Sequence, residues 1–130
     1  MDSVSSRPRV LVVDDERRTL DGLQILLRTA GLNVVATADD GDDALHKVDQ
    51  FDIDVVVMDI RMPRMDGVSA TRHIGRQRPQ TKVILFTAFD SSFEQATAKD
   101  AGAAGYLVKA RDEGLLPDAV RSAFGAAAEA

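Results

Sequence analysis

The middle of the chain reads VVVMDIRMPRMDG over residues 55–67. Four apolar residues, three of them β-branched, come directly before a single carboxylate, Asp59. Such a run without polar–apolar alternation is typical of a strand that is buried on both faces of a parallel sheet. Pro63 and Gly67 then mark a loop. The segment therefore predicts a buried strand that ends at an acidic side chain.

Similar apolar runs occur on either side of this segment. They predict further strands at residues 10–13, 83–86 and 106–108, and a weaker strand at residues 33–37. Segments with helical spacing of apolar residues lie between the strands. Alternating strands and helices predict a parallel sheet with right-handed crossovers and helices on both faces. We expect a flavodoxin-like, doubly wound α/β fold with five parallel strands in the order 2-1-3-4-5 and five helices.

Two of the expected helices have features that constrain them. Pro117 is tolerated only in the first turn of a helix, so the last helix should start near Glu113. The fourth helix is marked by Phe93, Ala96 and Ala101 and has few large apolar residues. That composition suits an element of low local stability.

Length and composition indicate one domain. The chain has 130 residues, of which residues 9–124 carry the regular pattern. Residues 1–8 are polar and Ser-rich and predict a mobile tail, and residues 125–130 are Ala-rich and predict a helix end or a linker remnant. The chain lacks cysteine, which excludes disulfides and thiolate metal sites.

The same composition bears on location and partners. No apolar run approaches the roughly 20 residues of a membrane span, and the first residues contain no signal-peptide core. We therefore expect a cytoplasmic protein without a membrane partner. The net charge of −5 disfavours direct nucleic-acid binding, because that binding depends on Lys and Arg neutralising phosphates.

Polar side chains follow the expected strands at the points where they end. Asp14 and Asp15 follow the first strand, Asp59 the third, Thr87 the fourth and Lys109 the fifth. Ligands of open parallel sheets bind at the carboxyl ends of the strands. We therefore expect two or three of these carboxylates, the hydroxyl and the ammonium to meet at one edge of the sheet.

This set of residue types suits phosphoryl transfer. Clustered carboxylates repel one another, and Mg²⁺ or another hard divalent cation with oxygen ligands would remove the conflict. A carboxylate such as Asp59 can attack phosphorus and form an aspartyl-phosphate. A Lys ammonium and a Thr hydroxyl can hold the remaining phosphoryl oxygens.

Four motifs resemble the receiver-domain signature of two-component response regulators. They are VVDDE at residues 12–16, VMDIRMPRMDG at 57–67, FTA at 86–88 and GYLVK at 105–109. The resemblance covers nearly the whole chain and is closest to the LuxR/NarL class. In that class a helix-turn-helix DNA-binding domain follows the receiver, so the resemblance implies such an output domain outside this chain.

The resemblance implies a role for each matching residue. Asp59 would be phosphorylated by a sensor histidine kinase. Asp15 would bind Mg²⁺ directly, Asp14 directly or through water, and the backbone carbonyl of Arg61 would complete the protein ligands. Thr87 would hydrogen-bond the phosphoryl group.

Two further residues have implied roles in the response. Lys109 would pair first with the acidic cluster and then with the phosphoryl oxygens. Tyr106 would be an aromatic switch that turns inward when Thr87 moves. The chain would not be a conventional enzyme, because it would catalyse only its own phosphorylation and dephosphorylation. Phosphorylation would change protein–protein contacts and could produce a homodimer.

Other functional classes share parts of the pattern. A haloacid-dehalogenase-type phosphatase requires Asp-x-Asp at the nucleophile, whereas Asp59 is followed by Ile60 and Arg61. A flavodoxin would carry a hydroxyl-rich phosphate loop after the first strand, which residues 14–16 do not provide. A stand-alone or phosphorylation-independent interaction module with the same fold is the remaining alternative.

Two local features leave open questions at the edge of the expected site. Many receivers have Pro after the Lys in a cis peptide, whereas Ala110 follows Lys109 here, so both cis and trans remain open. The acidic residues around Gly41 lack the spacing of a calcium loop and predict a solvated turn; they are Asp39, Asp40, Asp42 and Asp43.

Arg61 and Phe89 are expected near the acceptor, where they could influence hydrolysis.

Overall fold

The structure is a computed structural model that describes residues 7–129. Most of the expected tail at residues 1–8 therefore lies outside the described residues. Of its last two residues, Arg7 donates a hydrogen bond to the carbonyl of Gly31 and Pro8 is buried. None of the helices in residues 7–129 has both the length and the apolar character needed to cross a membrane.

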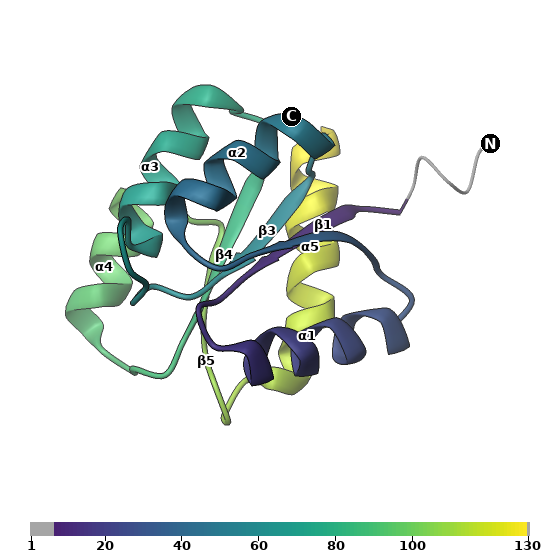
Figure 1. Ribbon diagram of the computed structural model, residues 1–130, viewed down its shortest axis with the longest axis horizontal. Coiled ribbons are helices and arrows are strands. Elements are labelled where there is room, and N and C mark those ends of the chain that lie inside the picture. The colour runs from purple at the N-terminus through teal and green to yellow at the C-terminus, as the bar shows by residue number, and fades with distance from the viewer. Residues whose placement is uncertain (1–6, 130) are drawn as a thin grey trace.

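A five-stranded parallel sheet forms the centre of the molecule, with the strand order β2-β1-β3-β4-β5 (Figure 1). The flavodoxin-like order expected from the sequence is confirmed, and each strand end agrees with the expected end to within one residue. The strands are β1 (Arg9–Val13), β2 (Asn33–Ala38), β3 (Val55–Met58), β4 (Lys82–Thr87) and β5 (Gly105–Val108).

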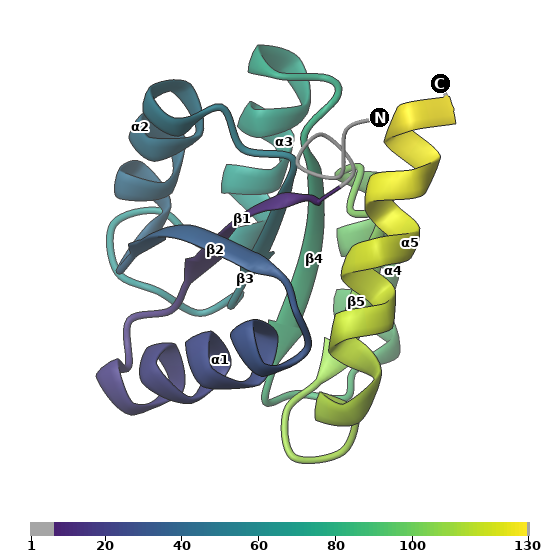
Figure 2. The same ribbon diagram turned by 90° about the vertical axis from the view of Figure 1, so that its right-hand side faces the viewer.

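Five α-helices cover the two faces of the sheet. Figure 2 shows α1 and α5 together on one side, and α2, α3 and α4 pack against the other. The helices are α1 (Arg17–Thr29), α2 (Gly41–Phe51), α3 (Gly67–Gln77), α4 (Ser92–Asp100) and α5 (Leu116–Glu129).

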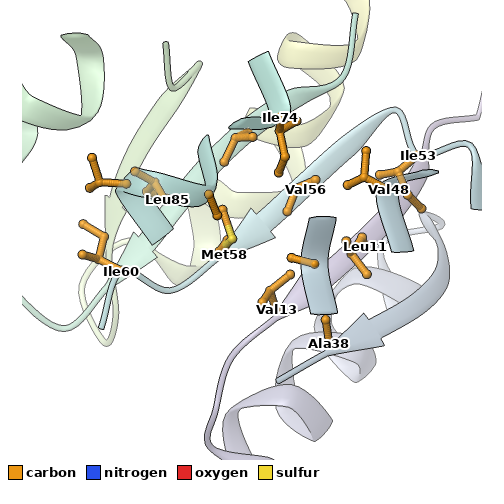
Figure 3. Close-up of a cluster of buried hydrophobic side chains, with 14 of the residues drawn as sticks. Leu11, Val13, Ala38, Val48, Ile53, Val56, Met58, Ile60, Ile74 and Leu85 are labelled. Carbon is orange, nitrogen blue, oxygen red and sulfur yellow. The ribbon is translucent and has the colours of Figure 1, made fainter. Parts of the chain in front are cut away.

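Successive residues of the central strands enter two separate cores. In β1, Leu11 and Val13 point toward α2 and α3, whereas Val10 and Val12 point toward α1 and α5. Because both faces are covered, all four side chains are almost completely buried. Figure 3 shows the first of these cores, in which side chains of β1 and β3 pack with Ile74 of α3.

The start of α5 agrees with the expectation from the sequence, whereas the burial of residues on α4 differs from it. A 3₁₀ turn over Glu113–Leu115 precedes α5, so helical backbone begins at Glu113 and Pro117 lies in the first turn. The fourth helix that Phe93, Ala96 and Ala101 marked is present as α4, but Phe93 is 79% exposed and Ala96 is also exposed, and the buried residue is Ala98. Phe93 lies in the first turn of α4.

The register of the parallel strands aligns their carboxyl ends. Val13 is paired with Met58, and Met58 with Leu85. The main chain continues this pairing past the strands, because Asp59 N donates to the carbonyl of Val13 at 3.0 Å. Since β2 and β3 lie on opposite sides of β1, the connections leave in opposite directions here, which opens a crevice at these ends.

The glycine at the start of α3 should be required for this arrangement. A Cβ on Gly67 would lie 2.1 Å from the carbonyl oxygen of Asp59, so the backbone would have to shift. We expect Gly67→Ala to lower the free energy of unfolding by about 1–3 kcal/mol in urea denaturation, as overpacking does.

The matched control is Gly75→Ala in the same helix, where a Cβ would meet nothing within 4 Å. It should raise the free energy of unfolding by about 0.5–1 kcal/mol, because Ala has the higher helix propensity. Equal effects of the two substitutions would show that the close approach at Gly67 is unimportant.

Candidate functional site

Three carboxylates meet at the carboxyl ends of β1 and β3. One oxygen from each of Asp14, Asp15 and Asp59 lies within 4.8 Å of the others. Asp14 is only 1% exposed and Asp59 is 9% exposed, whereas Asp15 is open to solvent. Residues that are far apart in the sequence are thus brought together because β1 and β3 are neighbours in the sheet, as the strand order predicts.

Lys109 lies among these carboxylates. Its Nζ is 2.7 Å from Oδ2 of Asp14 and 3.4 Å from Oδ2 of Asp59. Burial alone would lower the pKa of Lys109, but the hydrogen bond to Asp14 and the charge of Asp59 outweigh it and raise the pKa. The ammonium therefore remains charged and offsets part of the negative charge of the cluster.

Asp59 is held in an environment that disfavours its ionised form. Burial raises the pKa of Asp59, and the nearby charge of Asp14 adds to this, while the charge of Lys109 and the N–H of Ile60 act in the opposite direction. Lys109 alone therefore does not fully compensate the buried charge.

The donor set fits a hard divalent cation. One oxygen of Asp59 accepts a hydrogen bond from Ile60 N at 2.8 Å, and one of Asp14 accepts from Glu16 N at 2.9 Å. These bonds fix the orientation of two carboxylates whose other oxygens point into the cluster. Carboxylate oxygens without nitrogen or sulfur ligands are the set that Mg²⁺ prefers.

Thr87 and Tyr106 meet at a third residue, Phe89. Thr87 is fully buried at the end of β4, and its Oγ1 accepts a hydrogen bond from Phe89 N at 3.3 Å. The hydroxyl of Tyr106 donates to the carbonyl of Phe89 at 2.6 Å. Burial and the charge of Glu94 raise the pKa of Tyr106, so this hydroxyl keeps its proton. The β4–α4 loop thus links the two expected switch residues.

The side chain of Arg61 also contacts this loop. Its guanidinium lies over the ring of Phe89, 4.1 Å from the ring centroid, and forms an ion pair with Glu94 of α4. The acceptor loop and α4 are therefore joined by one side chain. Glu94 was not singled out by the sequence, because no motif includes it and only the packing of α4 brings it here.

The loop after Lys109 adopts a trans conformation. The structure contains no cis peptide bond within residues 7–129, and Ala110 has a positive φ of 68°. Asp112 closes the loop, because its Oδ2 accepts a hydrogen bond from Val108 N at 2.9 Å and its N donates to the carbonyl of Val108. The peptide geometry that the sequence left open is thus trans.

The expected solvated turn at residues 39–43 is wrong for Asp40. This side chain is 2% exposed, because it caps α2 by accepting from Asp43 N and pairs with Arg64 at 2.7 Å. The N–H of Asp43 and the Arg64 guanidinium keep the pKa of Asp40 below its usual value, against the opposing effect of burial. Composition alone could not show that a cation from the β3–α3 loop covers this carboxylate.

The comparisons with known proteins agree with the geometry. The family model described as the response regulator receiver domain matches residues 10–121. Response regulator GacA of Pseudomonas viridiflava is 38% identical over 117 residues, which are 89% of this chain and 55% of that protein. The chain spans about half the length of the curated relatives it matches.

Solved structures show the same similarity. The signal receiver domain of NarL from Mycobacterium tuberculosis matches with a TM-score of 0.82 at 32% identity. The match covers 95% of this chain and 98% of the NarL domain. The CheX–CheY–BeF3–Mg complex of Borrelia burgdorferi has a TM-score of 0.85 at 30% identity, with 95% of each chain covered. The resemblance to receivers of the LuxR/NarL class is thus confirmed.

The raised pKa of Asp59 predicts a pH-dependent effect of its substitution. A carboxyl whose pKa is higher in the folded than in the unfolded state destabilises the fold when it ionises, and this cost vanishes below both pKa values. Without metal, Asp59→Asn should therefore be more stable than the wild type at pH 7. The difference should shrink as the pH falls toward about 4, the ordinary carboxyl pKa.

Urea denaturation at several pH values measures this difference. The exposed residue Asp100 supplies the control, because Asp100→Asn should change the free energy of unfolding by less than about 0.5 kcal/mol. A destabilising effect of Asp59→Asn at pH 7 would contradict the account of the cluster.

Proposed function

Because the chain belongs to the response regulator receiver family, we propose that Asp59 accepts a phosphoryl group from a phosphohistidine of a sensor histidine kinase. The observation that carries the proposal is the placement of Lys109 Nζ between Asp14 and Asp59, within a group of three carboxylates. A nucleophile, a charge-balancing ammonium and an acid pair are together the groups that such a transfer needs.

Mg²⁺ would be held by the carboxylates of Asp14, Asp15 and Asp59 and by the backbone carbonyl of Arg61. When bound, the ion supplies positive charge that offsets the charge of the phosphoryl oxygens. The burial that raises the pKa of Asp59 supports this assignment, because the cluster carries more negative charge than Lys109 balances. The similar Borrelia burgdorferi CheY complex includes Mg²⁺ and BeF3.

In the transfer, an oxygen of Asp59 would attack phosphorus while the bond from phosphorus to the histidine nitrogen breaks. The electron pair of that bond returns to the imidazole, so no general base is required. The ammonium of Lys109, now 3.4 Å from Asp59, would pair with a phosphoryl oxygen. The chain would catalyse only this transfer and the later hydrolysis of its own aspartyl-phosphate.

The response would begin at Thr87. Its hydroxyl would turn toward the new phosphoryl oxygens, and the hydrogen bond from Phe89 N would be lost or rearranged. Since Tyr106 donates to the carbonyl of the same Phe89, a change in this loop would release Tyr106 as well. Phosphorylation adds roughly one to two negative charges at Asp59, and the arrangement that makes the better contacts with this charge would be favoured.

The wider partners follow from the family. We propose that the full-length protein carries a helix-turn-helix output domain, that phosphorylation favours a homodimer, and that the protein acts in the cytoplasm. The transcriptional regulators among the relatives, of which this chain spans about half, support the output domain.

Removing the acceptor carboxylate tests the proposal. The wild type incubated with acetyl phosphate and Mg²⁺ should gain the mass of one phosphoryl group, and Asp59→Asn should gain none. The control is Asp66→Asn in the same loop. Asp66 caps α3, and Asn is an almost equally good cap, so this variant should be labelled normally. Absence of labelling in the wild type would favour a phosphorylation-independent interaction module.

Lys109 should be needed for the response more than for the metal. Lys109→Ala removes a cation from the cluster, so Mg²⁺ should bind at least as tightly as in the wild type. The phosphorylated variant should nevertheless keep the Thr87 and Tyr106 amide NMR signals of the unphosphorylated protein. A normal phosphorylation-induced shift of these signals in Lys109→Ala would remove Lys109 from the proposed role.

A further inference from the structure

The β3–α3 loop, residues 59–66, is attached to the start of α2. The amide of Gly41, the first residue of α2, donates a hydrogen bond to the carbonyl of Met65 at 3.2 Å. A Cβ on Gly41 would lie 2.4 Å from that carbonyl oxygen, so only glycine allows this approach of the two main chains. Figure 1 shows α2 and α3, the helices that flank this loop, side by side on one face of the sheet.

The preceding residue, Asp40, makes a second attachment. Its Oδ1 accepts from Asp43 N at 2.8 Å, which caps α2, and its Oδ2 accepts from Nε of Arg64 at 2.8 Å and lies 2.7 Å from Nη2. The carboxylate of Asp40 is almost completely buried, whereas the side chain of Arg64 is 68% exposed. A buried charge is stable only with a well-placed partner, so the Asp40 end of this ion pair has a defined geometry although its Arg64 end lies at the surface.

Arg64 itself has a backbone conformation that is uncommon for a residue with a side chain. Its φ is 68°, in the left-handed region, and the neighbouring turn is closed by the hydrogen bond from Met65 N to the carbonyl of Pro63. An arginine at this position has to be held by contacts elsewhere. The structure provides such a contact, because Nε and Nη2 of Arg64 both lie against the same oxygen of Asp40, Oδ2.

The other end of the same loop is also fixed. Gly67 N donates to the carbonyl of Ile60 at 2.7 Å, directly beside Asp59. The segment Arg61–Pro63 therefore lies between two fixed points, which are the carbonyl of Ile60, bonded to Gly67 N, and the Asp40–Arg64 ion pair. Within it lies the Arg61 carbonyl, which is the one ligand in the proposed Mg²⁺ site that comes from the main chain and cannot be adjusted by a side-chain rotation.

We propose that Asp40 and Arg64 are positioning residues for Mg²⁺ at the acidic cluster, because their ion pair fixes the loop that carries the Arg61 carbonyl. This inference rests on the proposed function, since it assumes that the cluster binds Mg²⁺. Neither residue belongs to the cluster of Asp14, Asp15 and Asp59. They act on the metal only through the main chain of the loop.

The test compares two arginine substitutions. Arg64→Ala removes the ion pair but leaves Asp40 as the cap of α2. Arg78→Ala is the matched control, because Arg78 pairs with Asp49 at 3.2 Å and also joins the α2 and α3 regions, at the opposite helix ends and with an exposed rather than a buried carboxylate. Mg²⁺ affinity is measured for both by NMR titration of the metal-free protein, together with the thermal midpoint.

We expect Arg64→Ala to weaken Mg²⁺ binding by about tenfold, the lower end of the effect of removing an indirect support of a metal ligand. Arg78→Ala should keep the affinity of the wild type, and Arg64→Lys should recover part of the loss. Without metal, amide hydrogen exchange at Arg61, Met62 and Met65 should be faster in Arg64→Ala than in Arg78→Ala.

Equal Mg²⁺ affinity of Arg64→Ala and the wild type would overturn the inference and leave the proposed function intact. Equal losses in Arg64→Ala and Arg78→Ala would also overturn it, because the effect would then be one of general stability. If the wild type itself binds no Mg²⁺, the inference fails together with the proposed function.

Discussion

The repulsion between buried carboxylates at one edge of the sheet is the constraint on which the rest of the molecule depends. Asp14 and Asp59 are almost completely buried, and Asp15 lies within reach of both. Placing like charges so close together disfavours their ionisation. The ammonium of Lys109 offsets part of this cost, and its contact with two carboxylates at once explains why it is itself partly buried. The remaining negative charge is what a divalent cation and, later, Lys109 and Thr87 around a phosphoryl group would balance.

The sheet makes this arrangement possible because the paired strands β1 and β3 fix the main chain directly before Asp14 and Asp59. Asp14 and Asp59 each directly follow a strand whose side chains are buried on both faces, so the strand ends cannot separate to relieve the repulsion. The apolar burial in the two cores offsets the electrostatic cost of holding these carboxylates close together. The loops in front of the cluster are joined to neighbouring elements by polar contacts, such as Arg61 with Glu94 and Asp40 with Arg64. The strand ends thus fix the carboxylates, and the β4–α4 loop around Phe89 supplies the part that would move.

The sequence predicted those features that depend on strand composition and order. Buried strands are recognisable without their partners, and parallel strands bring the residues after them to one edge, so Asp14, Asp15, Asp59 and Lys109 could be grouped in advance. The exposure of Phe93 and the burial of Asp40 could not be predicted in this way. Both depend on where a neighbouring element ends and which side chain then covers the surface, and this is decided by the tertiary packing of loops.

The most direct test of the central claim is to locate a bound cation by NMR. Mn²⁺ can replace Mg²⁺ at an oxygen site, and it broadens the signals of nearby amides. Titration with small amounts of Mn²⁺ should first remove the amide signals of residues 14–16, 59–61 and 109, and excess Mg²⁺ should restore them. Broadening that begins at the acidic turn of residues 39–43, or that is uniform over the surface, would contradict the account.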